Sequence, residues 1–423
     1  MRTVTLLLAI VMVPTVAWGD LPRTGDPTTQ ITVTVGQGEA DFQGTDDKSL
    51  QGALDYVARL GGGVLHILPG EYSMRNALHL HSKVTVRGSG ENTVLKKTPS
   101  VRSKLSRDSD WYERVVYVED PAGFSVGGGV MLQSDRRPKG VFQSLQFTIV
   151  RIDGNALTVH KRLDKNFWLK DGASSATLYP LIRGERVNDV RIEGIVLDGN
   201  REENEEINGN YAGAIFMQWC DDVVIDGVTC RNYNGDGISL QVCDDPQILN
   251  TTCVNNANLG LHPGSGTQRP VYRNCVSNGN GQGFFFCWGV MGGLVEDCEF
   301  IDNVDYGISV GHRDTDNTIR NCRIVGNRKI GVYFRKEETE FFGGHRNVLE
   351  NCEIMDNGAD ADGVGIDIRG ETHDLIFRDC KIGDTGKGIQ KIGIRIGPKA
   401  TKIEWPGSSF VGLATEVERA KEE

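Results

Sequence analysis

A short motif recurs along the second half of the chain and limits the folds open to it. Each copy is a glycine, or an alanine in the first copy, followed by alternating apolar residues. The copies start at positions 214, 237, 260, 283, 307, 331, 365 and 393, so neighbours are 23 to 34 residues apart. One short strand per period is typical of a solenoid of stacked coils. We therefore predict an all-β chain that forms a right-handed, single-stranded parallel β-helix.

Two further columns of residues share this period. Neighbouring coils lie about 4.8 Å apart, so like residues can stack on like. We expect one internal cysteine ladder with free, buried thiols, because seven members cannot all pair: Cys230, Cys253, Cys275, Cys298, Cys322, Cys352 and Cys380. Asparagines five residues after five of these cysteines are expected in the turns: Asn258, Asn280, Asn303, Asn327 and Asn357.

The stretch at 41–95, which begins "DFQGTDDKSLQGALDYVARLGGG", resembles the start of the pectate-lyase-superfamily β-helix proteins. In that superfamily an amphipathic helix precedes the first coils, and the resemblance implies the fold without fixing a reaction. Here Asp46 is the expected N-cap, and glycines at 61–63 should end the helix. Its apolar face would cover the open end of the solenoid: Leu50, Leu54, Val57 and Leu60.

The rest of the chain divides by composition and period. Residues 1–19 have the pattern of a signal peptide with cleavage near Gly19–Asp20, which predicts a secreted or periplasmic protein. We assign 20–95 to the capping helix and first coils, 96–185 to an inserted small antiparallel β-domain, 186–400 to the main coils, and 401–423 to a C-terminal cap or tail. Asp153-Gly154-Asn155 is the hairpin signal in the insert.

Charge and hydropathy restrict the partners. The net charge of −11 argues against a nucleic-acid binder. No segment after the leader is long and apolar enough to be a transmembrane span. We expect a monomer whose partner is a polysaccharide.

Side chains at the alternate, outward positions of the repeated strand are not dictated by the core and indicate a ligand groove. The first outward column is Phe216, Ser239, His262, Phe285, Ser309, Tyr333, Asp367 and Arg395. The second is Gln218, Gln241, Gly264, Cys287, Gly311, Arg335, Arg369 and Gly397.

Histidine, tyrosine and arginine together suit β-elimination from a uronic acid, because a base must remove a proton beside a carboxylate that a cation holds. We predict a polysaccharide lyase with His312, Tyr333 and Arg335 as the leading catalytic group and His262, about 14 Å from His312, as a further candidate. Substrate-binding candidates are Asp236, Gln241, Phe285, Trp288, Tyr306, Arg313, Asp314, Lys336, Asp367 and Arg369.

Two other functions stay open. A glycoside hydrolase would depend on carboxylates such as Asp236, Asp314 and Asp367. "NYNGDG" at 232–237 resembles the asparagine-x-aspartate motif of polygalacturonases at Asp236, but the paired aspartates of that family are absent near 258–259, and "LHPGSG" does not match the Asp-Pro-His-Asp stretch of mannuronan epimerases. The other alternative is a non-catalytic glycan-binding protein.

No zinc spacing is present, and calcium is the cofactor that suits the acidic candidates: Asp305, Asp314 and Asp316.

Overall fold

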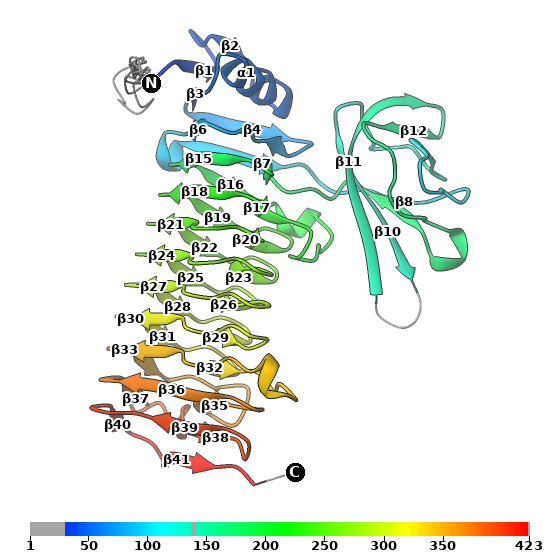
Figure 1. The fold of residues 1–423 in the computed structure, drawn as a ribbon. Coiled ribbons are helices and arrows are strands. Elements are labelled where there is room, and N and C mark those ends of the chain that lie inside the picture. The colour runs from blue at the N-terminus through cyan, green and yellow to red at the C-terminus, as the bar shows by residue number, and fades with distance from the viewer. Residues whose placement is uncertain (1–29, 137–140, 422–423) are drawn as a thin grey trace, which may run out of the picture.

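The computed structural model describes residues 30–136 and 141–421. The signal peptide expected at 1–19 lies outside the described residues. Most of the chain winds into a tall stack of coils with three parallel sheets along its length (Figure 1). The predicted right-handed parallel β-helix is confirmed.

Each coil contributes one strand to each sheet. The first sheet contains, in spatial order, β2 (Phe42–Gln43), β1 (Thr32–Gly36), β3 (Gly63–Ile67), β6 (Val84–Arg87), β15 (Asn188–Glu193), β18 (Asp221–Asp226), β21 (Gln247–Leu249), β24 (Val271–Arg273), β27 (Leu294–Glu296), β30 (Thr318–Arg320), β33 (Val348–Glu350), β36 (His373–Arg378) and β39 (Thr401–Glu404). The second contains β4 (Gly70–Met74), β7 (Thr93–Lys97), β16 (Val196–Asp198), β19 (Thr229–Arg231), β22 (Thr252–Val254), β25 (Val276–Asn278), β28 (Glu299–Ile301), β31 (Arg323–Val325), β34 (Glu353–Met355), β37 (Lys381–Gly383) and β40 (Ser409–Val411).

The third sheet carries the repeated motif. It contains β5 (Leu78–His79), β14 (Ile182–Glu185), β17 (Gly213–Gln218), β20 (Asp236–Gln241), β23 (Leu259–Pro263), β26 (Gln282–Phe285), β29 (Tyr306–Val310), β32 (Ile330–Phe334), β35 (Val364–Ile368), β38 (Ile392–Ile396) and β41 (Thr415–Arg419). Its register places Phe216 beside Ser239, and Ser239 beside His262. Tyr333 lies beside Asp367, which lies beside Arg395. The first outward column is therefore in the register that the sequence indicated.

The cysteines form two ladders instead of the expected single one. Cys230 pairs in register with Cys253, but Cys253 pairs with Ser277. Cys275 lies in the turn before β25, where its amide donates a hydrogen bond to the sulfur of Cys298 at 3.4 Å. The seven cysteines of the expected column are free and buried, as predicted, and so are Cys220, Cys243 and Cys287.

The same shift corrects the asparagine column. Asn256, not Asn258, is the member from its coil: its side chain donates to Oδ1 of Asn280 at 2.9 Å. Cys253 lies in the strand β22, three residues before Asn256. Cys275 lies in the turn before the strand β25, five residues before Asn280. Counting five residues from Cys253 therefore gives the wrong asparagine. The ladder continues through Asn303, Asn327 and Asn357 to Gln390.

The helix α1 (Asp47–Arg59) covers the N-terminal end of the solenoid (Figure 1). Asp46 and Ser49 form a reciprocal capping box that satisfies the first amides of the helix. Leu50, Leu54 and Val57 are buried as expected. Leu60 is exposed, because it is the C-cap residue beyond the apolar face.

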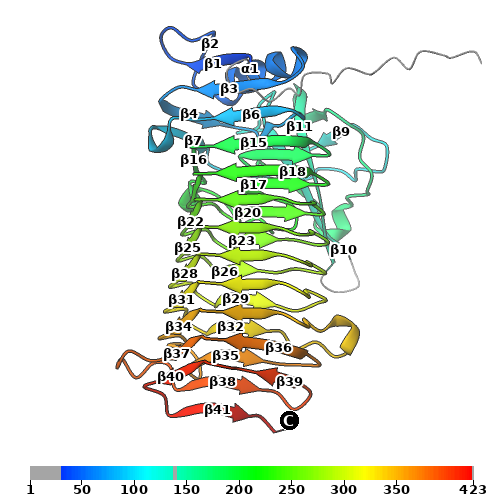
Figure 2. The same cartoon turned by 60° about the vertical axis from the view of Figure 1, so that its left-hand side comes forward.

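The insert is an antiparallel sheet that projects from the side of the stack near its N-terminal end (Figures 1 and 2). Its six strands have a separate hydrophobic core. In spatial order they are β8 (Arg102–Lys104), β13 (Ser174–Ala176), β10 (Gly129–Arg136), β11 (Val141–Asp153), β12 (Ala156–Val159) and β9 (Val115–Tyr117). Asp153 pairs with Ala156, so Gly154 and Asn155 make the expected two-residue turn.

The main segment of coils extends beyond both of its expected limits, 186 and 400. β14, in the segment assigned to the insert, pairs in parallel with β5 and β17 and belongs to the coils. The C-terminal segment assigned to a cap or tail adds β39, β40 and β41 to the three sheets. Four 3₁₀ turns complete the described elements: η1 (Gly90–Asn92), η2 (Leu169–Asp171), η3 (Arg201–Glu203) and η4 (Glu340–Phe342).

Candidate functional site

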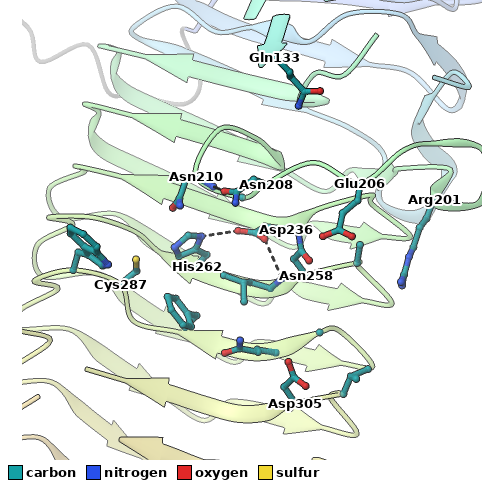
Figure 3. A pocket seen from close by; sticks show the side chains of 18 residues that line it. Gln133, Arg201, Glu206, Asn208, Asn210, Asp236, Asn258, His262, Cys287 and Asp305 are labelled. Atoms are coloured by element: carbon teal, nitrogen blue, oxygen red, sulfur yellow. Dashed lines mark hydrogen bonds and ion pairs between the residues drawn. The ribbon is translucent and has the colours of Figure 1, made fainter. Parts of the chain in front are cut away.

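A groove of about 820 Å³ lies against the outward face of β20, β23 and β26 (Figure 3). The loop that precedes β17 forms one wall, and Gln133 of the insert reaches its edge. The groove side chains are mainly polar, with a few aromatic and apolar ones: Gln133, Arg201, Glu206, Asn208, Asn210, Asp236, Ala257, Asn258, Leu259, His262, Gln282, Phe285, Cys287, Trp288, Val304 and Asp305, with Gly209 and Gly281.

Asp236 and His262 form a buried pair in this groove. The Nδ1 atom of His262 lies 2.7 Å from Oδ2 of Asp236, and their side chains are 3% and 1% exposed, respectively. The other carboxylate oxygen of Asp236 accepts the amide hydrogen of Leu259 at 3.1 Å. Any side chain at Gly209 would overlap the Asp236 carboxylate. Each carboxylate oxygen of Asp236 therefore has one polar partner, and the carboxylate lies where it can orient the imidazole ring.

This environment also controls the charge of His262. Burial alone lowers its pKa, but the Asp236 carboxylate and then the neighbouring Cys287 thiol outweigh burial and raise the pKa to about 9. Below that pH the ring is an imidazolium. Its Nε2 atom is buried and has no hydrogen-bond partner within the described part of the chain. The Cys287 side chain lies beside the ring (Figure 3).

Aromatic and amide groups complete the groove walls. Phe285 meets the His262 ring edge-on, with ring centroids 5.6 Å apart. Trp288 is 54% exposed. Exposed aromatic rings and side-chain amides are groups that bind sugar rings and hydroxyls. Asp305 is paired with Lys329 at 2.5 Å.

Arg335, one of the predicted catalytic residues, lies next to this groove but is held by structural partners. Its guanidinium donates to Ser309 Oγ and Asp314 Oδ2, each at 3.0 Å, and lies 4.4 Å from the centre of the Phe285 ring. Asp314 is fully buried and also accepts the amide hydrogens of Gly289, Val290 and Gly311. Burial raises the pKa of Asp314 to about 6, although Arg335 opposes that rise.

His312 is also enclosed. Its ring stacks between Trp288 at 4.1 Å and Phe342 at 4.7 Å, and its Nδ1 lies 3.3 Å from Glu337. Arg313 lies over the rings of Phe341 and Phe342. These contacts account for both residues as parts of an aromatic cluster.

The remaining predicted residues spread along the same face. Tyr306 and Tyr333 pack together, with ring centroids 4.8 Å apart. Asp367 is buried and paired with Arg369 at 2.8 Å. Lys336 is exposed, and Gln241 is buried with its amide donated to Ser239 Oγ at 3.0 Å.

The groove also contains residues that the sequence pattern did not single out. Arg201, Glu206, Asn208 and Asn210 belong to the loop before β17, which has no repeat to mark it. The Asp236–His262 pair has a readable signal: the two residues are 26 positions apart, one coil plus three residues. That spacing places His262 three residues further along its strand than the position level with Asp236, so the two side chains approach each other diagonally.

The three aspartates expected to suit calcium are each bonded to a cation of the protein. Asp305 pairs with Lys329, Asp314 with Arg335 and Asp316 with Arg346. Within the described residues, no group of three or more histidine, cysteine or acidic side chains is placed to hold a metal ion. No helix there has the length and hydropathy of a membrane span.

Comparisons with known proteins agree with this architecture. The A-module of mannuronan C-5 epimerase AlgE4 from Azotobacter vinelandii superposes with a TM-score of 0.53 at 14% identity, over 89% of this chain and 96% of that one. The Dettilon tailspike protein gp208 superposes with a TM-score of 0.53 at 9% identity, over 88% and 64%. At these identities the likeness shows the fold alone. No curated protein matches in sequence.

The family model described as "Right handed beta helix region" matches residues 157–289 and 213–382. Together these matches cover more than half of the 423 residues. The chain therefore belongs to the right-handed β-helix family.

Proposed function

We propose that this protein cleaves an acidic polysaccharide by β-elimination in the groove, with His262 as the base and Asp236 as its positioning residue. The observation that carries the proposal is the buried 2.7 Å pair between Asp236 and His262 in a polar groove with aromatic walls. A histidine held by a carboxylate at Nδ1 is oriented to exchange a proton at Nε2.

The proposed reaction starts at a uronate bound in the groove. Neutral His262 accepts the proton from C5, the electron pair forms the C4–C5 double bond, and the C4–O bond breaks as its oxygen takes a proton from water. A histidine with a pKa near 9 is a stronger base for removing the C5 proton than an ordinary histidine. Only a minor fraction of the His262 side chains is neutral at pH 7. The Cys287 thiol must move aside for substrate to reach Nε2.

Charge in the groove is compatible with an acidic ligand. The carboxylates of Asp236 and Asp305 each have a basic partner, His262 and Lys329. Arg201 supplies an exposed cation at the groove edge. The neighbour named a mannuronan C-5 epimerase acts, by its name, on a polysaccharide, and this supports the same ligand class here.

The test is an assay of purified protein on oligogalacturonate, oligomannuronate and neutral glucans. Ultraviolet absorption of unsaturated uronate and new reducing ends are followed together. We expect both signals from an acidic substrate, and we expect His262→Gln to abolish them while Lys170→Ala, at an exposed lysine of the insert that does not line the groove, retains them. Full activity in His262→Gln would overturn the assignment of the base.

Glycoside hydrolysis is the second candidate, favoured by two further acidic side chains in the same groove, Glu206 and Asp305. Hydrolysis would produce reducing ends without unsaturated product, and Glu206→Gln would reduce it. Binding without either signal would favour a glycan-binding protein.

A further inference from the structure

A second cavity, of about 260 Å³, lies between the insert and the outward face of β14 and β17. We call it the insert cleft. The insert contributes Ser144, Leu145, Gln146, Lys161, Asp164 and Lys165. The opposite side consists of Arg183, Glu185, Asn210, Tyr211, Phe216, Gln218 and Trp219.

Hydrogen bonds fix the two walls of the insert cleft against each other. Gln146 of the insert donates its amide to the carbonyl of Tyr211 at 2.7 Å, and its side-chain oxygen accepts from Arg183 at 2.5 Å. Nearby, the Asn76 amide donates to the Gly127 carbonyl at 3.0 Å and to Thr148 Oγ1 at 2.9 Å. The insert cleft is therefore a built cavity between two joined units.

The charges in the insert cleft leave two lysines available. Glu185 is satisfied by Arg183 at 3.0 Å and by Arg186 at 3.5 Å. Lys161 is exposed, with its ammonium 5.9 Å from the centre of the Phe147 ring, and it helps to lower the pKa of Glu185. Lys165 is partly exposed, and neither lysine makes an ion pair within 4.0 Å with any residue the structure describes. Asp164 is the opposing acidic group in the lining. In a protein of net charge −11, two such ammonium groups in one cleft favour an anionic ligand.

Trp219 adds an aromatic surface to the same cleft. Its side chain is 41% exposed, and the guanidinium of Arg186 lies 4.0 Å from the ring centre. An exposed tryptophan held by a cation on one side is a platform for a sugar ring.

The insert cleft continues the groove described above. Asn210 lines both cavities. In the register of the third sheet, Phe216 of the cleft lies two coils from His262 of the groove, about 10 Å at the usual strand spacing. One extended chain of sugars can therefore occupy both.

From this geometry we infer that the insert cleft binds uronate units of the same polysaccharide chain that enters the groove, with Lys161 and Lys165 on the carboxylates and Trp219 on a sugar ring. The inference rests on the proposed acidic substrate but not on the proposed reaction.

The experiment separates binding from cleavage. Dissociation constants for oligogalacturonate, oligomannuronate and cello-oligosaccharides of matched length are measured by calorimetry in the His262→Gln background. The charge reversal Lys161→Glu/Lys165→Glu is compared with Lys170→Glu. Lys170 is an exposed insert lysine that lies 4.2 Å from the centre of the Trp168 ring and does not line the insert cleft.

We expect the double charge reversal to weaken binding of an acidic oligomer at least about tenfold and to flatten its salt dependence, while Lys170→Glu leaves both unchanged. Trp219→Ala should weaken binding without changing the salt dependence. Equal affinity in the double variant and the Lys170→Glu control would overturn the inference, as would the absence of binding to either acidic oligomer. Binding lost in the double variant without any cleavage by the native protein would refute the lyase and leave the cleft assignment standing.

Discussion

The Nδ1 atom of His262 lies 2.7 Å from Oδ2 of Asp236, and both side chains are closed off from solvent. Burial lowers the pKa of His262, but other groups raise it to about 9, and the largest of these effects is the hydrogen bond with Asp236. A base with this pKa gains its neutral form as pH rises. We therefore expect kcat/KM to increase with pH, to reach half its plateau near pH 9 and to level off above that pH.

Removing the Asp236 carboxylate tests whether it is the cause of the raised pKa of His262. Asp236→Asn should shift the rise of kcat/KM toward acid pH, because the group that stabilises the imidazolium is gone. It should also lower kcat, by up to the 10²–10⁴-fold (roughly) that a positioned base contributes. Asp245→Asn is the matched control, because Asp245 is paired with Arg269 away from the groove. An unchanged profile in Asp236→Asn would separate the pair from catalysis.

Cys287 lies beside the ring of His262, the base in the proposed reaction. It is 6% exposed and lines the groove, so an alkylating reagent can reach it when the side chains around it move. We expect iodoacetamide to inactivate the native protein and to leave Cys287→Ala active. Residual activity after treatment, with the modified residue identified by mass spectrometry, is the measurement. Equal inactivation of Cys287→Ala would place the sensitive group elsewhere.

Substitution of Arg335 distinguishes a role in stability from a role in catalysis. Arg335→Leu leaves the buried Asp314 carboxylate without its cation, which costs about 3 kcal/mol of unfolding free energy. The pKa of Asp314 is already raised to about 6. A carboxyl whose pKa is raised on folding binds its proton more tightly in the folded state, so this group destabilises the fold as pH rises from about 4 through 6.

The loss in Arg335→Leu should therefore be larger at about pH 8 than at about pH 4.5, where Asp314 is protonated. Denaturant unfolding at the two pH values measures it, with the exposed Lys336→Ala as control. If activity is lost without any change in stability, Arg335 acts on substrate.

The asparagine ladder predicts a sharp contrast between Asn303, a member of the ladder, and Asn258, which lies about two coil periods earlier in the sequence and outside the ladder. The Asn303 side chain donates to the Ser277 carbonyl and to Asn327, and it accepts the amide hydrogen of Asn280. Asn303→Ala should cost about 1–3 kcal/mol for each buried group left unpaired. Asn258→Ala should leave the unfolding midpoint nearly unchanged and weaken oligosaccharide binding, because Asn258 lines the groove.

The repeated strand was predictable because its side chains alternate and its period is nearly constant. The first outward column, from Phe216 to Arg395, needed nothing but the position of the motif. The predicted cysteine and asparagine columns were wrong at one coil. Cys253 lies in a strand and Cys275 lies in a turn, although the spacing between them fits the period.

The candidate site was less accessible to sequence reasoning. His262 and Asp236 were both recognised, but an outward strand position does not reveal burial. The loop with Gly209 packs against the Asp236 carboxylate, and both side chains of the pair are buried. This loop has no repeat that places it. Conversely, His312 and Arg335 have reactive side chains but are committed to stacking and ion-pair partners, which no spacing rule shows.

The position of the insert has a consequence for folding kinetics. Within the main stack, strands pair across one period, but β6 and β15 pair across the whole insert, with Val86 opposite Ile192. Every other coil junction downstream is a local contact, and local contacts form quickly. The entropic cost of closing the long loop between β6 and β15 grows only with the logarithm of the loop length. The insert reduces this cost when it folds around its own core. We expect the coils before the insert and the coils after it to nucleate independently. The pairing of β6 with β15 should then set the overall rate at which the native state appears.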